Sequence, residues 1–284
     1  MKNKIKGVNM KVTEIINDAF VFPSKNMRIF LIYLILSLLA GIFSVMGISI
    51  YVLGFVIPEC FLWGGIAAIV SMLIGWVISG YSISVIKSGI EHDGNVPKFE
   101  WWDNFTTGFD NFIVAVVYFI IPAFIVAVVG YLTNIYGNII IVVQETVSQI
   151  LNFITGTSTV FAVDAITQAI DNLIASLVIT ATVGIILFII FLFLQTMAEA
   201  RLANTGSLSE ALNIFEAAKD IGRIGVGKVI ILIILLFIIV GIINIVLTAI
   251  ASFLPILSIL SVIISPYLLL FTKRAVGLLY SDIA

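Results

Sequence analysis

Long uninterrupted apolar runs dominate the chain, and the segments between them carry its charges. Six runs are long enough for a helix to cross the hydrocarbon core of a bilayer, which takes about 20 residues: 29–53, 62–86, 112–132, 173–195, 229–250 and 254–272. None of the six contains an Asp, Glu, Lys, Arg or His. Strands of a membrane barrel need only about 9–11 residues and alternate in polarity, so continuous runs indicate helices. The pattern predicts an all-α fold: a polytopic membrane helix bundle with six transmembrane helices in one domain, 29–272.

The basic residues predict how this bundle is oriented. All 14 Lys and Arg lie in the N-terminal segment 1–28, the loops 87–111 and 196–228, and the tail 273–284. The segments 54–61, 133–172 and 251–253 contain none. Because cytoplasmic loops carry the excess of Lys and Arg, we expect both termini in the cytoplasm, 133–172 as an outer loop, and a location in the cell (plasma) membrane. The first run is too long for a cleavable signal and is expected to remain as the first span. Residues 1–9 are basic and patternless, and Met10 is an alternative start.

Several connecting segments have helical periodicity. Val12, Ile15 and Ala19 recur at helical spacing, which predicts a short amphipathic helix along the inner interface rather than a disordered basic tail. Ser207 and Glu210 have the spacing of a capping box at the start of a second inner amphipathic helix. The outer loop is expected to form two amphipathic helices joined by a turn at 156–159, the first too polar to span.

An aromatic row lies in the inner loop 87–111. Phe99, Trp102, Phe105 and Phe109 fall on one side of a helix, with acidic residues opposite, and Trp101 adds a second indole. Indole combines an apolar body with a polar N–H and is enriched at membrane interfaces, so we interpret this segment as a separate interfacial helix that anchors the loop. The alternative is an aromatic platform that binds a partner.

Polar residues inside the spans are mostly small. They recur every four residues at Ala67, Ser71, Gly75 and Ser79, at Ser176, Thr180 and Gly184, and at Asn244 and Thr248. Small residues let helix backbones approach closely, which favours packing as their role. The alternative is a polar pathway where these stripes meet, with Asn244 and Thr248 as its polar groups within the membrane.

Composition excludes several classes of protein. Of the 284 residues 61% are hydrophobic and 11% charged, against about 25% charged in soluble domains. A soluble enzyme, a disordered chain and a nucleic-acid binder are therefore not expected. We also predict no metal site and no cofactor: the adjacent Glu91, His92 and Asp93 cannot easily converge on one ion. The glycine-rich run before Lys228 is followed by Val229, where a phosphate-binding loop has Ser or Thr.

One stretch resembles a known family. Its residues are Gly80, Tyr81, Gly94, Pro97, Trp102, Phe105, Gly108, Phe109, Tyr118 and Pro122. The chain is similar, over about residues 10–280, to the prokaryotic membrane proteins grouped as domain of unknown function 4013. That resemblance implies a membrane location and no established activity, and segment 133–172 looks like an insertion.

These observations lead to two functional hypotheses. Ion-coupled transporters usually place ionisable residues within the membrane, and none of the six spans has one. We expect a non-enzymatic integral membrane protein: a scaffold, an assembly factor or an envelope component. Its partners are then the lipid bilayer and other membrane proteins or further copies of itself, with no nucleic acid and no metal. The alternative is a facilitative transporter or channel for a small neutral or lipid-like solute.

Overall fold

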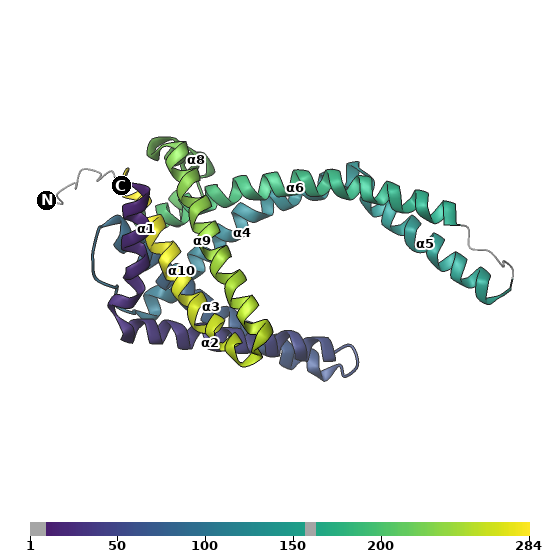
Figure 1. Cartoon of the computed structure of the whole chain (residues 1–284), viewed down its shortest axis with the longest axis horizontal. Helices are drawn as coiled ribbons and strands as arrows, with labels where there is room; N and C mark the ends of the chain where they lie inside the picture. The colour runs from purple at the N-terminus through teal and green to yellow at the C-terminus, as the bar shows by residue number, and fades with distance from the viewer. Residues whose placement is uncertain (1–9, 157–162) are drawn as a thin grey trace. The chain divides into compact units, whose positions relative to one another are not determined.

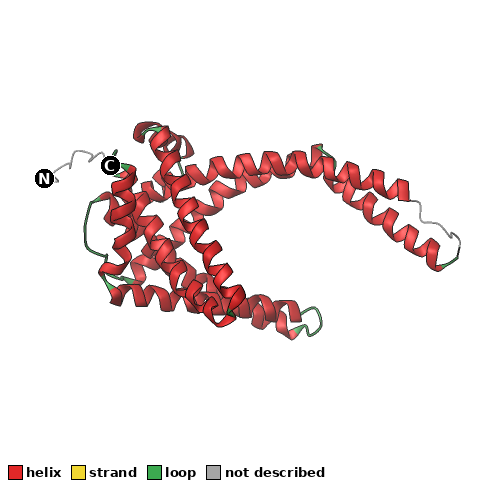
Figure 2. Ribbon diagram, viewed as in Figure 1, coloured by secondary structure: helices red, strands yellow, loops and turns green. Residues whose placement is uncertain are grey.

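The computed structural model describes residues 10–156 and 163–284, and in these residues all regular structure is helical, as Figure 2 shows. The elements, most of them labelled in Figure 1, are α1 (Val12–Val21), η1 (Phe22–Lys25), α2 (Met27–Leu53), α3 (Glu59–Ile90), α4 (Trp101–Leu132), α5 (Ile135–Ile154), α6 (Val163–Thr205), α7 (Leu208–Ala211), α8 (Ile214–Ile224), α9 (Val226–Phe253), η2 (Pro255–Ser258) and α10 (Ile259–Tyr280). Seven of them are long and apolar enough to cross a membrane: α2, α3, α4, α5, α6, α9 and α10.

The chain divides into two compact units. The first unit runs through Ala115 and resumes at Leu194–Ala284, and the second unit is Val116–Phe193. Helices α4 and α6 contribute residues to both.

An aromatic core holds the first unit together. Helices α2 and α3 pack along each other, and α10 packs against α3 and α1 although α1 and α10 come from opposite ends of the chain (Figure 1). Between them lies a buried cluster of Phe22, Phe30, Tyr33, Tyr81, Val85 and Leu270. The Tyr33 hydroxyl is 3.1 Å from the Ser82 hydroxyl, and the Tyr81 hydroxyl donates to the carbonyl of Pro97. Buried tyrosine hydroxyls thus have partners, as a low-dielectric interior requires.

Helices α3 and α4 touch backbone to backbone within the first unit. A Cβ on Gly80 would lie 1.7 Å from the carbonyl oxygen of Asn104, and one on Gly108 would lie 1.7 Å from that of Trp76. Only glycine permits this approach. Small residues therefore do set a helix contact, but at Gly80 and Gly108 rather than at Gly75, where a Cβ would meet nothing within 4 Å.

The predicted N-terminal helix is present as α1, but part of its apolar face meets protein. Ile15 and Ala19 are fully buried, and α1 packs on α10. The expectation that this face lies against lipid was therefore wrong for these two residues. The reason is that α10 offers an apolar surface of its own in the same unit.

The aromatic row is not a separate helix. It begins α4, which continues without a break from Trp101 to Leu132. The expected boundary between an interfacial helix and a spanning helix at residue 112 was wrong, because the charged residues of this segment end there but the helix does not. Backbone hydrogen bonding carries on, since no proline precedes Pro122 in this helix.

In the second unit, small polar residues join α6 to the end of α4 and the start of α5. The hydroxyl of Ser176 donates to the carbonyl of Thr133 and accepts from the Asn138 amide. Thr180 is hydrogen-bonded to the hydroxyl of Thr133 at 3.0 Å. A Cβ on Gly184 would lie 3.4 Å from Val126, an ordinary contact.

The expected outer loop 133–172 differs from the structure in two ways. Its first predicted helix is α5, which has the lowest hydropathy of the seven but still qualifies as a spanning helix by length and composition. Its second predicted helix is the beginning of α6, which runs 43 residues through the predicted fourth span. A separate second helix was therefore a wrong expectation. The predicted turn at 156–159 lies, beyond Gly156, outside the described residues.

Candidate functional site

A buried hydrogen-bonding centre of the first unit is formed by Arg274, near the end of α10. This side chain is 1% exposed. Its Nε donates to Asp18 Oδ1 at 3.0 Å, and its Nη1 donates to the Ser88 hydroxyl and to the carbonyl of Asp93. The guanidinium also lies 4.4 Å from the centre of the Phe22 ring, within the range of a cation–π contact. Arg274 thereby links α10 to α1, to α3 and to the loop after α3.

A second buried ion pair joins Arg201 of α6 to Asp220 of α8. The distance from Nη1 to Oδ2 is 2.7 Å, and Asp220 is 1% exposed. Asp220 also accepts from the Tyr280 hydroxyl and from Arg223. A buried carboxylate needs such donors because burial removes its water.

The predicted capping box is absent at the start of α7. Ser207 makes no side-chain cap, and the Glu210 carboxylate pairs instead with Arg201 at 2.7 Å. Two donors could bind the Glu210 carboxylate, a neutral backbone N–H and the charged guanidinium, and the hydrogen bond from the charged donor is the stronger one.

Two further ion pairs complete the network. Lys273 binds Glu199 of α6, and Lys228 of α9 binds Asp282 after α10. We call the whole set the inner clamp: Asp18, Ser88, Asp93, Glu199, Arg201, Glu210, Asp220, Arg223, Lys228, Lys273, Arg274, Tyr280 and Asp282. Its charges come from segments that the basic-residue pattern assigns to one side of the membrane. The chemistry is that of paired charges that hold helices together.

Sequence reasoning missed the inner clamp because charges in connecting segments are usually solvated. A signal was present nonetheless. Arg274 and its neighbour Lys273 lie in the largely apolar stretch 268–280, and Asp220 and its neighbour Lys219 follow Ala217 and Ala218. Charged residues inside an otherwise apolar stretch indicate that at least one of them is buried and paired.

The predicted aromatic surface is divided by the structure. Phe105 and Phe109 pack against Trp76 of α3, with ring centres 5.5 and 4.9 Å apart, and Phe99 stacks on Tyr81. Trp102 is 73% exposed and Trp101 is also exposed. Only the two tryptophans therefore present most of their surface to lipid or to a partner.

The predicted packing stripe of α3 makes two interhelical hydrogen bonds. Ser71 donates to the carbonyl of Ala40 in α2, and Ser79 accepts from Asn111 in α4. Ala67 is buried, whereas Gly75 has open space beside it.

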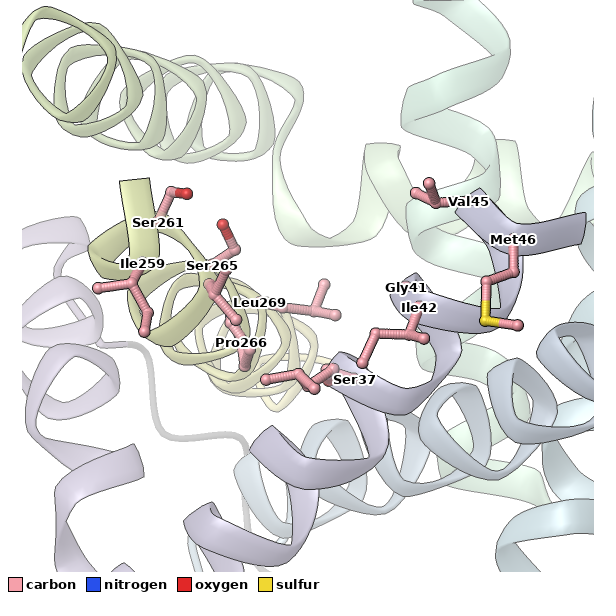
Figure 3. Close-up of a pocket in the computed structure, with 12 residues that line it drawn as sticks. Ser37, Gly41, Ile42, Val45, Met46, Ile259, Ser261, Ser265, Pro266 and Leu269 are labelled. Atoms are coloured by element: carbon pink, nitrogen blue, oxygen red, sulfur yellow. The ribbon is translucent and has the colours of Figure 1, made fainter. Parts of the chain in front are cut away.

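An apolar groove of about 820 Å³ lies between α2 and α10 (Figure 3). Gly41 and Met46 are on its α2 side, and Ser265 and Leu269 are on its α10 side. A smaller recess of about 200 Å³ shares Ser265 and Leu269 with the groove and is also lined by the predicted polar residue Asn244. Asn244 and Thr248 are both exposed, and the Asn244 amide donates to the carbonyl of Val240 in its own helix. The groove is large enough for a lipid-like molecule.

The fold and these sites define a polytopic helical membrane protein whose charges are gathered outside its apolar spans. The family model described as "Protein of unknown function (DUF4013)" matches residues 63–256, about two thirds of the chain, and the chain belongs to this family. The match includes the Gly80–Pro122 stretch that carries the resemblance, whereas α1, α2 and α10 lie outside it. No curated protein and no solved structure matches the chain.

Proposed function

We propose that this protein is a non-enzymatic scaffold or assembly component of the cell membrane. The inner clamp is the observation that supports this role. It fixes the inner ends of α1, α3, α6, α8, α9 and α10 to one another through buried charges, while long apolar helix faces remain uncovered. A rigid polar end with free apolar flanks suits a protein that holds other membrane proteins, or further copies of itself, in place.

The proposal includes six crossings with both termini in the cytoplasm. Seven crossings would place loop 196–228, with its four basic residues, on the opposite side from loop 87–111 and from the N-terminus. That arrangement violates the positive-inside rule. We therefore assign α5, the least hydropathic candidate, to the outer side rather than to a crossing.

A catalytic role has little support in the chemistry of the inner clamp. Its guanidinium and carboxylate groups are engaged with one another, and a general acid or base needs a free group within reach of a substrate. We accordingly propose no reaction, cofactor, metal or nucleic acid for this chain.

Affinity purification from native membranes in mild detergent tests the proposed role. Two differently tagged copies should co-purify with each other or with defined partner proteins at a fixed ratio. Asp220→Asn, which breaks the inner clamp, should lose these partners, whereas Asp171→Asn on the exposed surface of the second unit should retain them. A monodisperse wild-type chain that carries lipid alone would contradict the proposal.

The groove between α2 and α10 favours a second function, facilitated movement of a lipid-like solute. A flux assay in proteoliposomes distinguishes it from the scaffold. Gly41 lines the groove with open space beside it, so Gly41→Trp should block saturable flux, and Asn244→Leu should weaken it. Gly65→Trp, also in open space but outside the groove lining, is the matched control. Saturable flux lost in the first two variants and kept in the third would replace the scaffold with a transporter.

A further inference from the structure

A polar pocket lies where α3 ends and α4 begins, next to the inner clamp, with which it shares Ser88 and Asp93. Its volume is about 210 Å³. Nine of its ten lining residues are polar or charged: Ser84, Lys87, Ser88, Glu91, Asp93, Lys98, Glu100, Asp103 and Asn104, with Pro97 as the tenth. Pockets for drug-sized molecules run from roughly 300 to 1,000 Å³, so this one suits a group of only a few heavy atoms.

Asn104 in the pocket wall has a hydrogen-bond donor to spare. Its side chain is 2% exposed, and the Oδ1 atom lies 3.4 Å from the hydroxyl of Ser84, another lining residue. Its Nδ2 is buried and has no partner among the described residues. Because a buried N–H without an acceptor is costly, an oxygen of a bound group would satisfy it. The close contact of Gly80 with the Asn104 backbone holds this residue in position.

The charges around the pocket are not paired with one another. In the part of the chain that the structure describes, Lys87, Lys98, Glu91, Glu100 and Asp103 form no ion pair. Every arginine of the inner clamp, in contrast, is bonded to a carboxylate. The lining has two lysines and four acidic residues, and this excess of acidic residues favours a ligand with a positive group. The two lysines and the Asn104 amide are hydrogen-bond donors, and they favour an anionic oxygen on the same ligand.

The pocket lies at the level of lipid headgroups. Lys87 directly follows the apolar run of α3, and the exposed Trp101 and Trp102 stand at the start of α4. Exposed tryptophans are enriched at membrane–water interfaces, so Lys87 and the two tryptophans both indicate headgroup depth for the pocket.

We propose that this pocket binds a phosphoethanolamine group. The amide N–H of Asn104 and the lysines bind its phosphate oxygens, and the carboxylates of the rim bind its primary ammonium. The group is either the headgroup of an ethanolamine phospholipid or a free phosphoethanolamine ester. The site does not depend on whether the protein is a scaffold or a transporter.

Native mass spectrometry of the full chain in detergent tests the site. Phosphatidylethanolamine should be retained about tenfold better than phosphatidylcholine, whose quaternary ammonium cannot donate a hydrogen bond, and better than phosphatidylglycerol, which has no ammonium. The factor corresponds to one hydrogen bond to a charged group. Soluble glycerophosphoethanolamine, added in competition, distinguishes the two sources: displacement of the lipid indicates that the headgroup alone is recognised. Equal retention of the three lipids, with no binding of the soluble ester, would overturn the proposal.

Variants with matched controls distinguish the loss of this binding site from a general loss of folding. The double variant Glu100→Gln with Asp103→Asn changes only exposed rim residues and should lose the preference for ethanolamine. Glu145→Gln with Asp171→Asn removes the same two charges in the second unit and should keep it. Asn104→Leu should weaken retention of all three phosphate-bearing lipids. An unchanged preference in the rim variant would also overturn the site.

Discussion

Arg274 and Asp18, which are 256 positions apart in the sequence, form a 3.0 Å ion pair that fastens the last long helix to the first. The guanidinium is buried, whereas the Asp18 side chain is about one-third exposed. Arg274 therefore depends on this partner more than Asp18 does, because a buried charge that loses its counter-ion has no water to replace it.

Removal of either partner should destabilise the first unit. We expect Asp18→Ala, which leaves the buried Arg274 guanidinium without its counter-ion, to raise the free energy of the folded state by about 3–5 kcal/mol, the range for breaking a buried ion pair. Arg223→Gln is the control. Its side chain is 53% exposed, so it should cost no more than about 1 kcal/mol. Thermal unfolding in detergent measures both, and equal losses would show that burial does not determine the strength of these pairs.

A glycine series separates close helix contacts from open positions. Gly80→Ala should destabilise strongly, because its Cβ would overlap the Asn104 carbonyl oxygen and force α3 and α4 apart. Gly75→Ala should be neutral or slightly stabilising, since alanine favours helix and nothing lies within 4 Å. The fraction of monodisperse protein after heating in detergent compares them. A Gly75 variant as damaging as the Gly80 variant would restore the packing role predicted for the stripe at residues 67–79.

The apolar spans were predictable from the sequence, whereas the lengths of two helices were not. The run 29–53 nearly coincides with α2, because hydrophobic length alone determines a crossing. Helices α4 and α6 extend well beyond their apolar runs because polar residues also sustain backbone hydrogen bonds. Hydropathy marks where the lipid ends rather than where the helix ends.

The partners of the charged residues were not predictable either. Asp220 and Arg201 are 19 positions apart and Arg274 is far from both Asp18 and Ser88, so no local spacing reveals the pairs. Asn104 had no visible role in the sequence pattern, since its burial follows from Gly80 on another helix. Contacts of this kind depend on how the helices pack against one another, and this packing cannot be read from a single sequence.

Glu216 on α8 predicts a pH dependence. A hydrogen bond from Lys219 is the main cause that lowers the pKa of this carboxyl below its ordinary value of about 4.3. A lowered folded-state pKa means that the stabilisation is present above the ordinary pKa and is lost as the pH falls through the folded value. Glu216→Gln should therefore lower the unfolding midpoint slightly at neutral pH and have no effect in strong acid. A difference that persists in acid would mean that the contact is not ionic.

Membrane topology is tested with single cysteines in a Cys60→Ser background. Cysteines at positions 98, 156 and 216 report on loop 87–111, on the segment after α5 and on α8. With six crossings and both termini inside, an impermeant thiol reagent applied to intact cells should label position 156 alone. If α5 also crosses, position 156 returns to the inside and position 216 moves outside, so the labelling pattern reverses between these two positions. Labelling of all three after the cells are permeabilised is the control for reactivity. A label at 216 in intact cells would place Asp220 and Arg274 outside while Asp18 and Ser88 stay inside. It would therefore contradict the Arg274–Asp18 ion pair as well as the charge argument for six crossings.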